Sequence, residues 1–268
     1  MVLFHKFLKC AHLNIRSAST INKKINKPTI ICELIFDYNL DILTLSETLF
    51  TENTLPAVLN FIIPHHFSLL HTPRSQKSGG GVAAIYRSQL KANIIHNNYY
   101  NSFEIIAIKY TISNSLFNTY TIYRPPSTSN APFIAEFSTL LEDVISLTSQ
   151  IIVLSDYNIH VDTPTLPNFA LFITLLDTFH PSQHNNFPTH ITGHTLELLK
   201  TRCYSTLVSN ISKFDPSISD HHAITFEFLL TLDLLILLIL LDPLKTSILL
   251  TSPMTSLLLI YILSLLLN

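Results

Sequence analysis

The sequence predicts a mixed α/β domain in which strands and helices pack in layers. Helical and strand-like apolar patterns alternate through the first half of the chain, and pairs of strands lie near its middle. The 268 residues are enough to bury a substantial core. Hydrophobic residues make up 47% of the chain and charged residues 13%, a composition too apolar for a disordered chain.

The first helix and strand are predicted within residues 27–48, KPTIICELIFDYNLDILTLSET. Pro28 opens a stretch whose apolar residues follow helical spacing, and a Tyr-Asn turn ends it. A compact apolar run then predicts a strand that ends at Glu47. The acid therefore stands where a strand gives way to a loop.

Three of the four glycines lie together at positions 79–81, in SGGGVAAIYRS, and an apolar strand follows them. A glycine cluster can cradle phosphate, but neither G-x-G-x-x-G nor the Walker Lys-Ser/Thr is present. A tight turn before a strand is the preferred interpretation.

Residues 103–112 and 116–126 predict two strands joined by a polar Asn-Ser turn, because both are rich in Ile, Tyr, Phe and Thr. Residues 131–150 place Phe and Leu on one helical stripe, and IIVLS at 151–155 follows as a strand. Residues 162–218 are rich in Pro, Thr and His, which predicts long loops with short elements between them.

Charge and cysteine usage bear on whether the protein binds nucleic acid and whether disulfides stabilise it. A formal net charge of −2 gives no global attraction to nucleic acid, although a local basic face remains open. Cys10, Cys32 and Cys203 are odd in number, far apart and without a C-x-x-C pair, which argues against a disulfide framework and favours a reducing compartment. The first residues show no cleavage pattern of a signal peptide.

Polar residues stand at the ends of five predicted strands, where layered α/β folds commonly form binding sites. They are Asn14, Glu47, Tyr123, the pair Asp156 and Asn158, and the run Ser219, Asp220 and His221. Taken singly, each has a structural interpretation such as a loop acid, an Asx turn or a half-buried strand tyrosine. Their combination and order point to a site.

These residues lie in motifs that resemble those of the endonuclease/exonuclease/phosphatase superfamily, and most of all the apurinic-type endonuclease domain of non-LTR (LINE-type) retrotransposons. The motifs occur in the family's order and span about residues 11–228: LNIRS, LTLSET, GGGVAAIYR, IYRPP, LSDYNIH, PTHITGHTLELL and SDHHAITFEF. GGGV and YRPP are weak signals alone, whereas the ordered set is specific.

The resemblance implies a four-layer α/β sandwich, with two packed mixed sheets between outer helices, and a Mg²⁺-dependent phosphodiesterase, with Mn²⁺ as a substitute, that nicks DNA. Glu47 would be the main metal ligand, with Asn14 and Asp220 close by. Asp156 would orient or deprotonate the attacking water. Tyr123, Asn158 and His221 would contact the phosphate, and Glu197 would support His221. Thr189, Arg124 and Ser219 would line the substrate site. Carboxylates, an amide and a paired histidine suit this chemistry, because Mg²⁺ prefers oxygen ligands.

Two positions depart from the family pattern. Ser155 stands where the family has the glycine of GDFN, and Glu197 stands where GHTLDL has an aspartate. An extra methylene displaces a carboxylate by about a bond length, and errors of that order can cost ~100-fold in rate. A catalytically impaired remnant therefore stays open. Zinc is not favoured for His180, His184 and His190, because no H-E-x-x-H or finger spacing is present.

Residues 229–268 form a separate class, with three charged side chains among forty residues. The run 246–267 approaches the ~20 residues that cross a bilayer, but Pro253 and several Ser and Thr weaken it. A membrane tail and a leucine-rich extension without function are both open, and no reverse-transcriptase domain follows. We expect an endonuclease domain at 1–228 that acts on DNA in the nucleus or cytoplasm, the alternative being a membrane-tethered phosphodiesterase or phosphatase.

Overall fold

The computed structural model describes residues 3–22, 24–54, 56–72, 80–95, 100–112, 115–146, 150–162, 167–202 and 205–233. Phe7–Leu230 form one compact unit, and Met1–Lys6 group separately with Thr231–Asn268. The apolar run predicted at 246–267, most of the run at 229–241, Gly79 and Cys203 lie outside the described residues. Within the described part, no helix has the length and apolar character needed to cross a bilayer.

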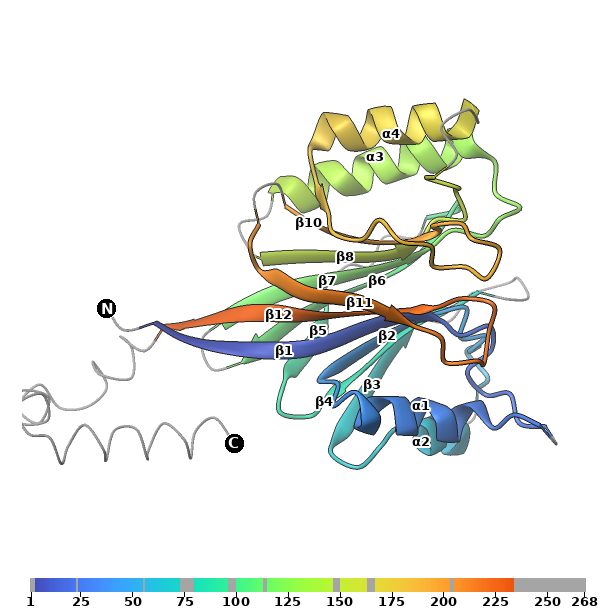
Figure 1. Ribbon diagram of the computed structural model, residues 1–268, viewed down its shortest axis with the longest axis vertical. Helices are drawn as coiled ribbons and strands as arrows, with labels where there is room; N and C mark the ends of the chain where they lie inside the picture. Colours follow the sequence, from blue (N-terminus) through green and yellow to red (C-terminus); the bar gives the residue numbers. More distant parts are fainter. Residues whose placement is uncertain are drawn as a thin grey trace, which may run out of the picture. The chain divides into compact units, whose positions relative to one another are not determined.

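The unit Phe7–Leu230 is built on two six-stranded mixed sheets (Figure 1). The strands of the first sheet, in spatial order, are β11 (Val208–Phe214), β12 (Ala223–Asp233), β1 (Leu3–Asn14), β2 (Ile42–Ser46), β4 (Val82–Arg87) and β3 (Phe67–Thr72). Those of the second are β5 (Lys91–Ile94), β6 (Glu104–Ile112), β7 (Ser115–Tyr123), β8 (Gln150–Asp156), β10 (Glu197–Thr201) and β9 (Ser182–Gln183).

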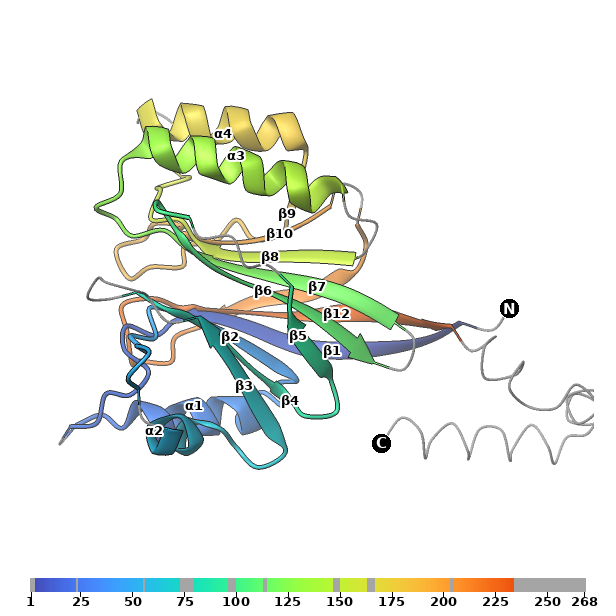
Figure 2. The same cartoon turned by 180° about the vertical axis from the view of Figure 1, so that it is seen from behind.

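Helices cover the outer faces of both sheets. α1 (Lys27–Asp37) and α2 (Pro56–Ile62) lie against the first sheet, and α3 (Asn130–Ser146) and α4 (Pro167–Phe179) against the second (Figures 1 and 2). The result is the predicted four-layer sandwich. It follows from amphipathic strands and helices, which must each bury one apolar face against another layer.

Three apolar clusters hold the layers together. The cluster between the sheets contains packed rings: Tyr110 stacks on Phe117 at 5.0 Å, and Phe228 lies tilted against Phe117 at 5.0 Å, both measured between ring centroids. A second cluster joins the first sheet to α1 and α2. The third joins the second sheet to α3 and α4, and includes the buried rings of Phe133 and Phe137.

The two parallel strand pairs are each joined by one helix, as a parallel connection requires. β1 and β2 run parallel with α1 between them in sequence, and β7 and β8 run parallel with α3 between them. The predicted order of helix, turn and strand in residues 27–48, and of helix and strand in residues 131–155, is therefore confirmed.

The region 162–218 contains more regular structure than its composition predicts. α4 occupies thirteen residues of it, and the seven-residue strand β11 lies near its end. Phe172 in α4 is fully buried against the rings of Phe133 and Tyr157. Tertiary packing of a few apolar residues thus fixes a helix that Pro- and Thr-rich neighbours obscure in the sequence.

Candidate active site

Strand register sets three polar side chains of the second sheet in one row. Tyr123 at the end of β7 pairs with Asp156 at the end of β8, and Asp156 pairs with Glu197 at the start of β10. Paired residues point to the same face of a sheet. All three side chains are buried, at the edge of the cluster between the sheets.

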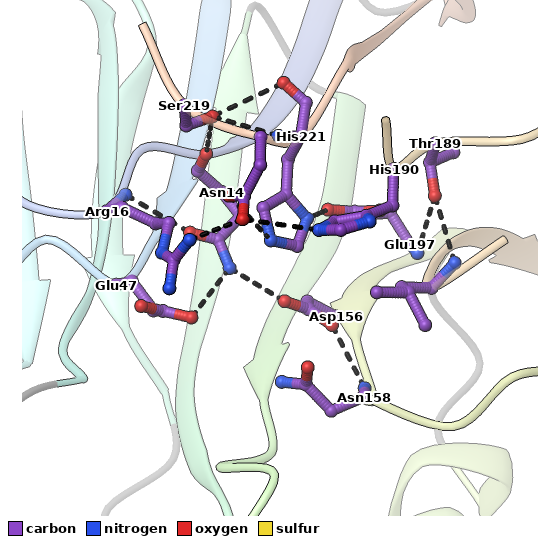
Figure 3. A network of polar contacts seen from close by, with 12 residues as sticks. Asn14, Arg16, Glu47, Asp156, Asn158, Thr189, His190, Glu197, Ser219 and His221 are labelled. Carbon is purple, nitrogen blue, oxygen red and sulfur yellow. Dashed lines mark hydrogen bonds and ion pairs between the residues drawn. The ribbon is translucent and has the colours of Figure 1, made fainter. Parts of the chain in front are cut away.

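The first sheet supplies Asn14 and Glu47 opposite this row. Asn14 ends β1 and pairs with Ser46, so Glu47 is the first residue beyond the parallel partner strand. Asn14 donates from Nδ2 to Glu47 Oε1 at 2.8 Å and to Asp156 Oδ2 at 2.7 Å (Figure 3). One amide therefore ties together two carboxylates that are 109 positions apart in the chain, at 47 and 156.

The chain reverses sharply at the strand ends that carry these groups. Arg16, Ser17, Glu47, Leu49 and Asn158 all have positive φ, between 44° and 78°. Such a conformation is uncommon for residues other than glycine, and it costs energy that the surrounding structure must compensate. Backbone hydrogen bonds do so here, for example from Ser17 N to Glu47 O at 2.7 Å.

Gly80 and Gly81 support the Glu47 loop, whereas the tight turn predicted at 79–81 includes Gly79, which lies outside the described residues. Thr48 N donates to Gly81 O at 3.1 Å, and Leu49 N donates to Gly80 O at 2.8 Å. Gly81 has φ 89°, and a Cβ atom there would lie 2.6 Å from Thr48 Oγ1. Only glycine fits this position, because both the backbone angle and the close approach exclude a side chain.

Gly81→Ala is therefore expected to destabilise the protein by more than about 1 kcal/mol and to lower activity beyond the loss of folded protein. The matched control is Gly193→Ala, because Gly193 also has φ 89° but a Cβ atom there meets nothing within 4 Å. Chemical denaturation measures the loss of stability, and the initial reaction rate per folded protein measures the loss of activity. Equal losses in both variants would mean that the contact with Thr48 does not position Glu47.

The second part of the site is a buried imidazole between carboxylates. His221 Nδ1 contacts Glu197 Oε1, and both side chains are almost fully buried. Burial by itself lowers the pKa of His221, but the hydrogen bond and charge of Glu197, with the charges of Asp156 and Asp220, raise it to about 9. Burial, followed by the charge of Glu197, raises the pKa of Asp156 to about 7. The geometry thus favours the protonated, positively charged form of His221 beside the acidic side chains of Glu197, Asp156 and Asp220.

These shifts predict that the metal-free protein loses stability as the pH rises. The pKa values of His221 and Asp156 are both raised on folding, so the folded state binds protons more tightly than the unfolded state. The stability that this proton binding adds is lost as the pH rises through the pKa values of the folded state. For His221 this window runs from 6.5, its ordinary pKa, to about 9. Urea denaturation in EDTA should show that the free energy of unfolding falls between these pH values, and that it falls less in Glu197→Gln. Identical pH dependence in the two proteins would contradict the pairing.

Asp220 stands at the outer side of the same imidazole. Arg16 donates to its Oδ2, and His190 Nε2 lies 3.3 Å from the same oxygen. Burial acts to raise the pKa of Asp220, but the positive charges of His221 and Arg16 and its hydrogen bonds lower it overall. Asp220 therefore remains a carboxylate at neutral pH.

The donor set fits the divalent cation that the family implies. Glu47, Asp156 and Asp220 offer the hard carboxylate oxygens that Mg²⁺ and Mn²⁺ prefer. Among the described residues, Asp220 Oδ1 and Glu197 Oε2 are buried without a hydrogen-bond partner. Groups of His, Asp and Glu with converging ligand atoms also occur here. Unsatisfied buried oxygens at the edge of a polar site are what a cation and its water ligands would satisfy.

Asn14 is placed differently from the prediction that it lies among the metal ligands. Its Oδ1 accepts from Arg16 N at 3.1 Å, so its Nδ2 faces the two carboxylates. An amide nitrogen donates hydrogen bonds and does not coordinate a cation. The geometry gives Asn14 the task of holding Glu47 and Asp156 in place.

The three residues predicted to line the substrate site make hydrogen bonds within the protein. Arg124 is 3% exposed and donates to Tyr157 O at 3.1 Å and to Asn130 Oδ1 at 2.7 Å. Thr189 Oγ1 accepts from Leu196 N and Glu197 N at 2.9 and 3.1 Å, and Ser219 Oγ donates to Asn14 O at 2.8 Å. These contacts satisfy backbone groups at strand ends, so the structure places all three as supports of the site.

Tyr123 and Asn158 lie beside the carboxylates. Burial, followed by the charge of Glu47, raises the pKa of Tyr123, so its phenol stays protonated and can donate. Asn158 N donates to Asp156 Oδ1 at 3.0 Å, and Asn158 Nδ2 donates to Arg124 O at 2.8 Å. The ring of His160, further along the chain, lies tilted against that of His194 at 4.0 Å between centroids, and His194 Nδ1 contacts Asp162 Oδ2 at 2.9 Å in a separate group.

The structure accommodates both departures from the family pattern. Ser155 is fully buried, alternates with Asp156 along β8, and its Oγ lies 3.3 Å from Leu198 O. Its side chain thus faces away from Asp156. The longer side chain of Glu197 still reaches His221 Nδ1. Both side chains therefore fit within the hydrogen-bonded arrangement of the site.

Sequence reasoning missed Arg16 and Lys27, and it considered His190 only as a zinc ligand that was not favoured. Arg16 and His190 both contact Asp220, and Lys27 Nζ donates to Ile15 O and Arg16 O, each at 2.6 Å, which fixes the turn after Asn14. Arg16 and His190 are neighbours of predicted residues within LNIRS and PTH. That proximity was the available signal, whereas the role of Lys27 depends on the packing of α1.

Comparisons with known proteins agree with this architecture. The model of the endonuclease/exonuclease/phosphatase family matches residues 11–221. No curated protein sequence matches the chain. Similar solved structures include the endonuclease domain of TRAS1, a telomere-specific non-LTR retrotransposon, with a TM-score of 0.63, 11% identity, and coverage of 83% of this chain and 98% of that one.

Two further structures share the fold. The AP endonuclease LMAP from Leishmania major has a TM-score of 0.64 at 12% identity, with 83% of this chain and 87% of that chain covered. The 3′ phosphatase NExo from Neisseria, bound to a product DNA hairpin, has a TM-score of 0.58 at 16% identity, with 82% and 99% covered. At these identities the likeness concerns the fold. The family match spans most of the chain, and the protein therefore belongs to the endonuclease/exonuclease/phosphatase family.

Proposed function

We propose that this protein is a divalent-metal-dependent endonuclease that nicks DNA. The observation that carries the proposal is the bridge from Asn14 to Glu47 and Asp156, set beside the buried pair of Glu197 and His221. Phosphodiester hydrolysis needs an oriented water and compensation of the charge that grows on the phosphate. Asp156 in the bridge can orient the water, and His221 in the buried pair can compensate the charge on the phosphate.

The role of each side chain follows from its protonation and contacts. Asp156, held by Asn14 and Asn158, accepts a proton from the attacking water or orients it. His221, kept cationic by Glu197, and Tyr123, kept protonated by burial, donate to oxygens of the phosphate. When bound by Glu47 and Asp220, Mg²⁺ supplies further positive charge that lowers the energy of the charged transition state.

Similarity to the retrotransposon endonuclease fold supports a more specific role. Hydrolysis that leaves a 3′ hydroxyl at a target-site nick gives an end from which a reverse transcriptase can extend. We propose this priming role for the chain, with target-site duplex DNA as its partner in the nucleus or cytoplasm. No separate protein partner is required by the chemistry.

The proposal is tested with the full chain on supercoiled plasmid at millimolar Mg²⁺, Mn²⁺ or Ca²⁺, or with EDTA. Conversion to open circles with Mg²⁺ or Mn²⁺ alone is expected, and the nick should be extended by a DNA polymerase without prior end repair. Nicking that continues in EDTA would overturn the metal dependence. Release of phosphate from 3′-phosphorylated duplex or a phosphomonoester, without nicking, would assign the chain to the phosphatases of the family instead.

A further inference from the structure

A second group of metal-ligating atoms lies on the outer side of the site, away from the bridge between Glu47 and Asp156. His190, Asp220 and His221 each present one ligand atom, and all three atoms lie within 4.8 Å of one another. His190 Nε2 is 3.3 Å from Asp220 Oδ2, and His221 Nε2 is 3.5 Å from Asp220 Oδ1. With metal–ligand bonds of ~2.0–2.1 Å, ligand atoms around a tetrahedral ion stand roughly 3.3 Å apart. The two observed separations are near this spacing, but each ends on a different oxygen of Asp220; with one ligand atom per residue, the three atoms lie within 4.8 Å of one another.

The ring of His221 is oriented as metal-ligating histidines usually are, and the ring of His190 is fixed by its own loop. Ligating histidines hold their second ring nitrogen against an acceptor, which fixes the ring and the tautomer. His221 Nδ1 contacts Glu197 Oε1 in this way, whereas His190 Nδ1 lies 2.7 Å from Thr192 Oγ1 and accepts from Thr192 N at 3.3 Å. Each ring is therefore held at Nδ1 while its Nε2 lies within 3.5 Å of an oxygen of Asp220. Figure 3 shows the rings of His190 and His221 side by side.

The backbone holds the ligands in this arrangement before any ion arrives. His190 and His221 form an isolated antiparallel bridge between their two segments. Ile191 N donates to Asp220 O at 3.0 Å, and His222 N donates to Thr189 O at 2.7 Å. A site fixed by main-chain hydrogen bonds loses little conformational entropy when it binds.

We propose that His190, Asp220 and His221 form a site for Zn²⁺ or a similar transition-metal ion. Two neutral imidazole nitrogens and one carboxylate suit Zn²⁺, whereas Mg²⁺ prefers oxygen ligands alone, so the ion must displace the proton that Glu197 favours on His221. The site shares Asp220 with the proposed Mg²⁺ site and His221 with the proposed phosphate contacts, so an ion there competes for Asp220 and removes the His221 donor from the substrate. Zn²⁺ is thus expected to inhibit nicking; this consequence rests on the proposed function, while the metal site does not.

The positive charge of Arg16 competes with a metal ion for Asp220, so removing it should strengthen Zn²⁺ binding. Its guanidinium donates to Asp220 Oδ2, the oxygen nearest His190, and its side chain is 55% exposed. An exposed ion pair of this kind contributes little stability and is readily displaced. Arg16→Gln removes the competing positive charge and should tighten Zn²⁺ binding.

The test measures binding separately from catalysis. Calorimetric titration of the metal-free full chain with Zn²⁺, in the presence of millimolar Mg²⁺, should show one saturable site, and Co²⁺ should give a tetrahedral absorption spectrum. His190→Gln should weaken binding at least ~10-fold. The matched control is His194→Gln in the same loop, because His194 contacts Asp162 and lies outside the group. It should bind as the wild type does.

The outcomes separate this site from the proposed function. Zinc binding lost in His190→Gln and retained in His194→Gln supports the site even in a protein that does not nick DNA. If nicking is observed, Zn²⁺ should inhibit the wild type and leave His190→Gln resistant. Absence of saturable binding overturns the site. So does equal binding by wild type and His190→Gln, which would place the ion on Asp156, Glu197 and His221.

Discussion

Asp156→Asn is expected to lower the rate of Mg²⁺-dependent nicking by roughly 10³-fold, within the range that a positioned general base contributes. The carboxylate is fully buried, accepts hydrogen bonds from Asn14 and Asn158, and has a pKa raised to about 7 by burial and the charge of Glu197. It can therefore take a proton near neutral pH. The amide keeps the shape of the side chain but not this basicity.

Folding should survive the substitution. A buried carboxylate with a raised pKa is held in its charged form at a cost, so a neutral side chain of equal size removes that cost. Asp162→Asn is the matched control, because Asp162 is a partly exposed acid that contacts His194 outside the cluster. It should nick at the wild-type rate. Comparable activity in the two variants at equal thermal stability would remove Asp156 from the reaction.

Glu47→Gln is expected to lower nicking by more than about 100-fold at millimolar Mg²⁺ and to raise the Mg²⁺ concentration needed for half-maximal rate. Loss of groups that only support a metal ligand costs about 10–100-fold, so loss of a ligand should cost at least as much. Glu47 is partly exposed at the end of β2, and its carboxylate accepts from Asn14 at 2.8 Å. The variant should remain folded.

The metal dependence distinguishes this role from a general loss of structure. Higher Mg²⁺ or Mn²⁺ should recover part of the activity of Glu47→Gln, because weakened binding is offset by concentration. Glu142→Gln, on the exposed side of α3, provides the control for the change of Glu to Gln. A reduced rate with an unchanged Mg²⁺ requirement would show that Glu47 does not hold the metal.

Much of the site was accessible from sequence because parallel strands deliver their ends to one edge of a sheet. Asn14, Glu47, Tyr123 and Asp156 follow apolar runs directly, so their convergence could be predicted before any contact was known. Asp220 and His221 likewise stand next to an apolar run, and the resemblance in ordered motifs added Glu197, which no periodicity would have singled out. The structure brings all seven into one region.

Other features depended on contacts between distant segments. The composition of residues 162–218 predicted long loops, yet the buried Phe172 packs α4 against the ring of Phe133 in α3. Arg124, Thr189 and Ser219 were expected at the substrate, but each binds backbone groups of the chain. A side chain's direction at a strand end depends on which neighbouring groups lack partners, and sequence does not display that.

The sequence by itself determined the layered α/β architecture, the family, and the strand ends that carry acid, amide and imidazole groups, because periodicity and motif order are local properties. Only the tertiary structure decided what those groups do to one another. It turned the nitrogen of Asn14 toward two carboxylates, enclosed His221 between Glu197 and Asp220, and set His190 beside them. Hydrogen-bond direction, burial and charge proximity arise when remote segments meet, and they set the chemistry.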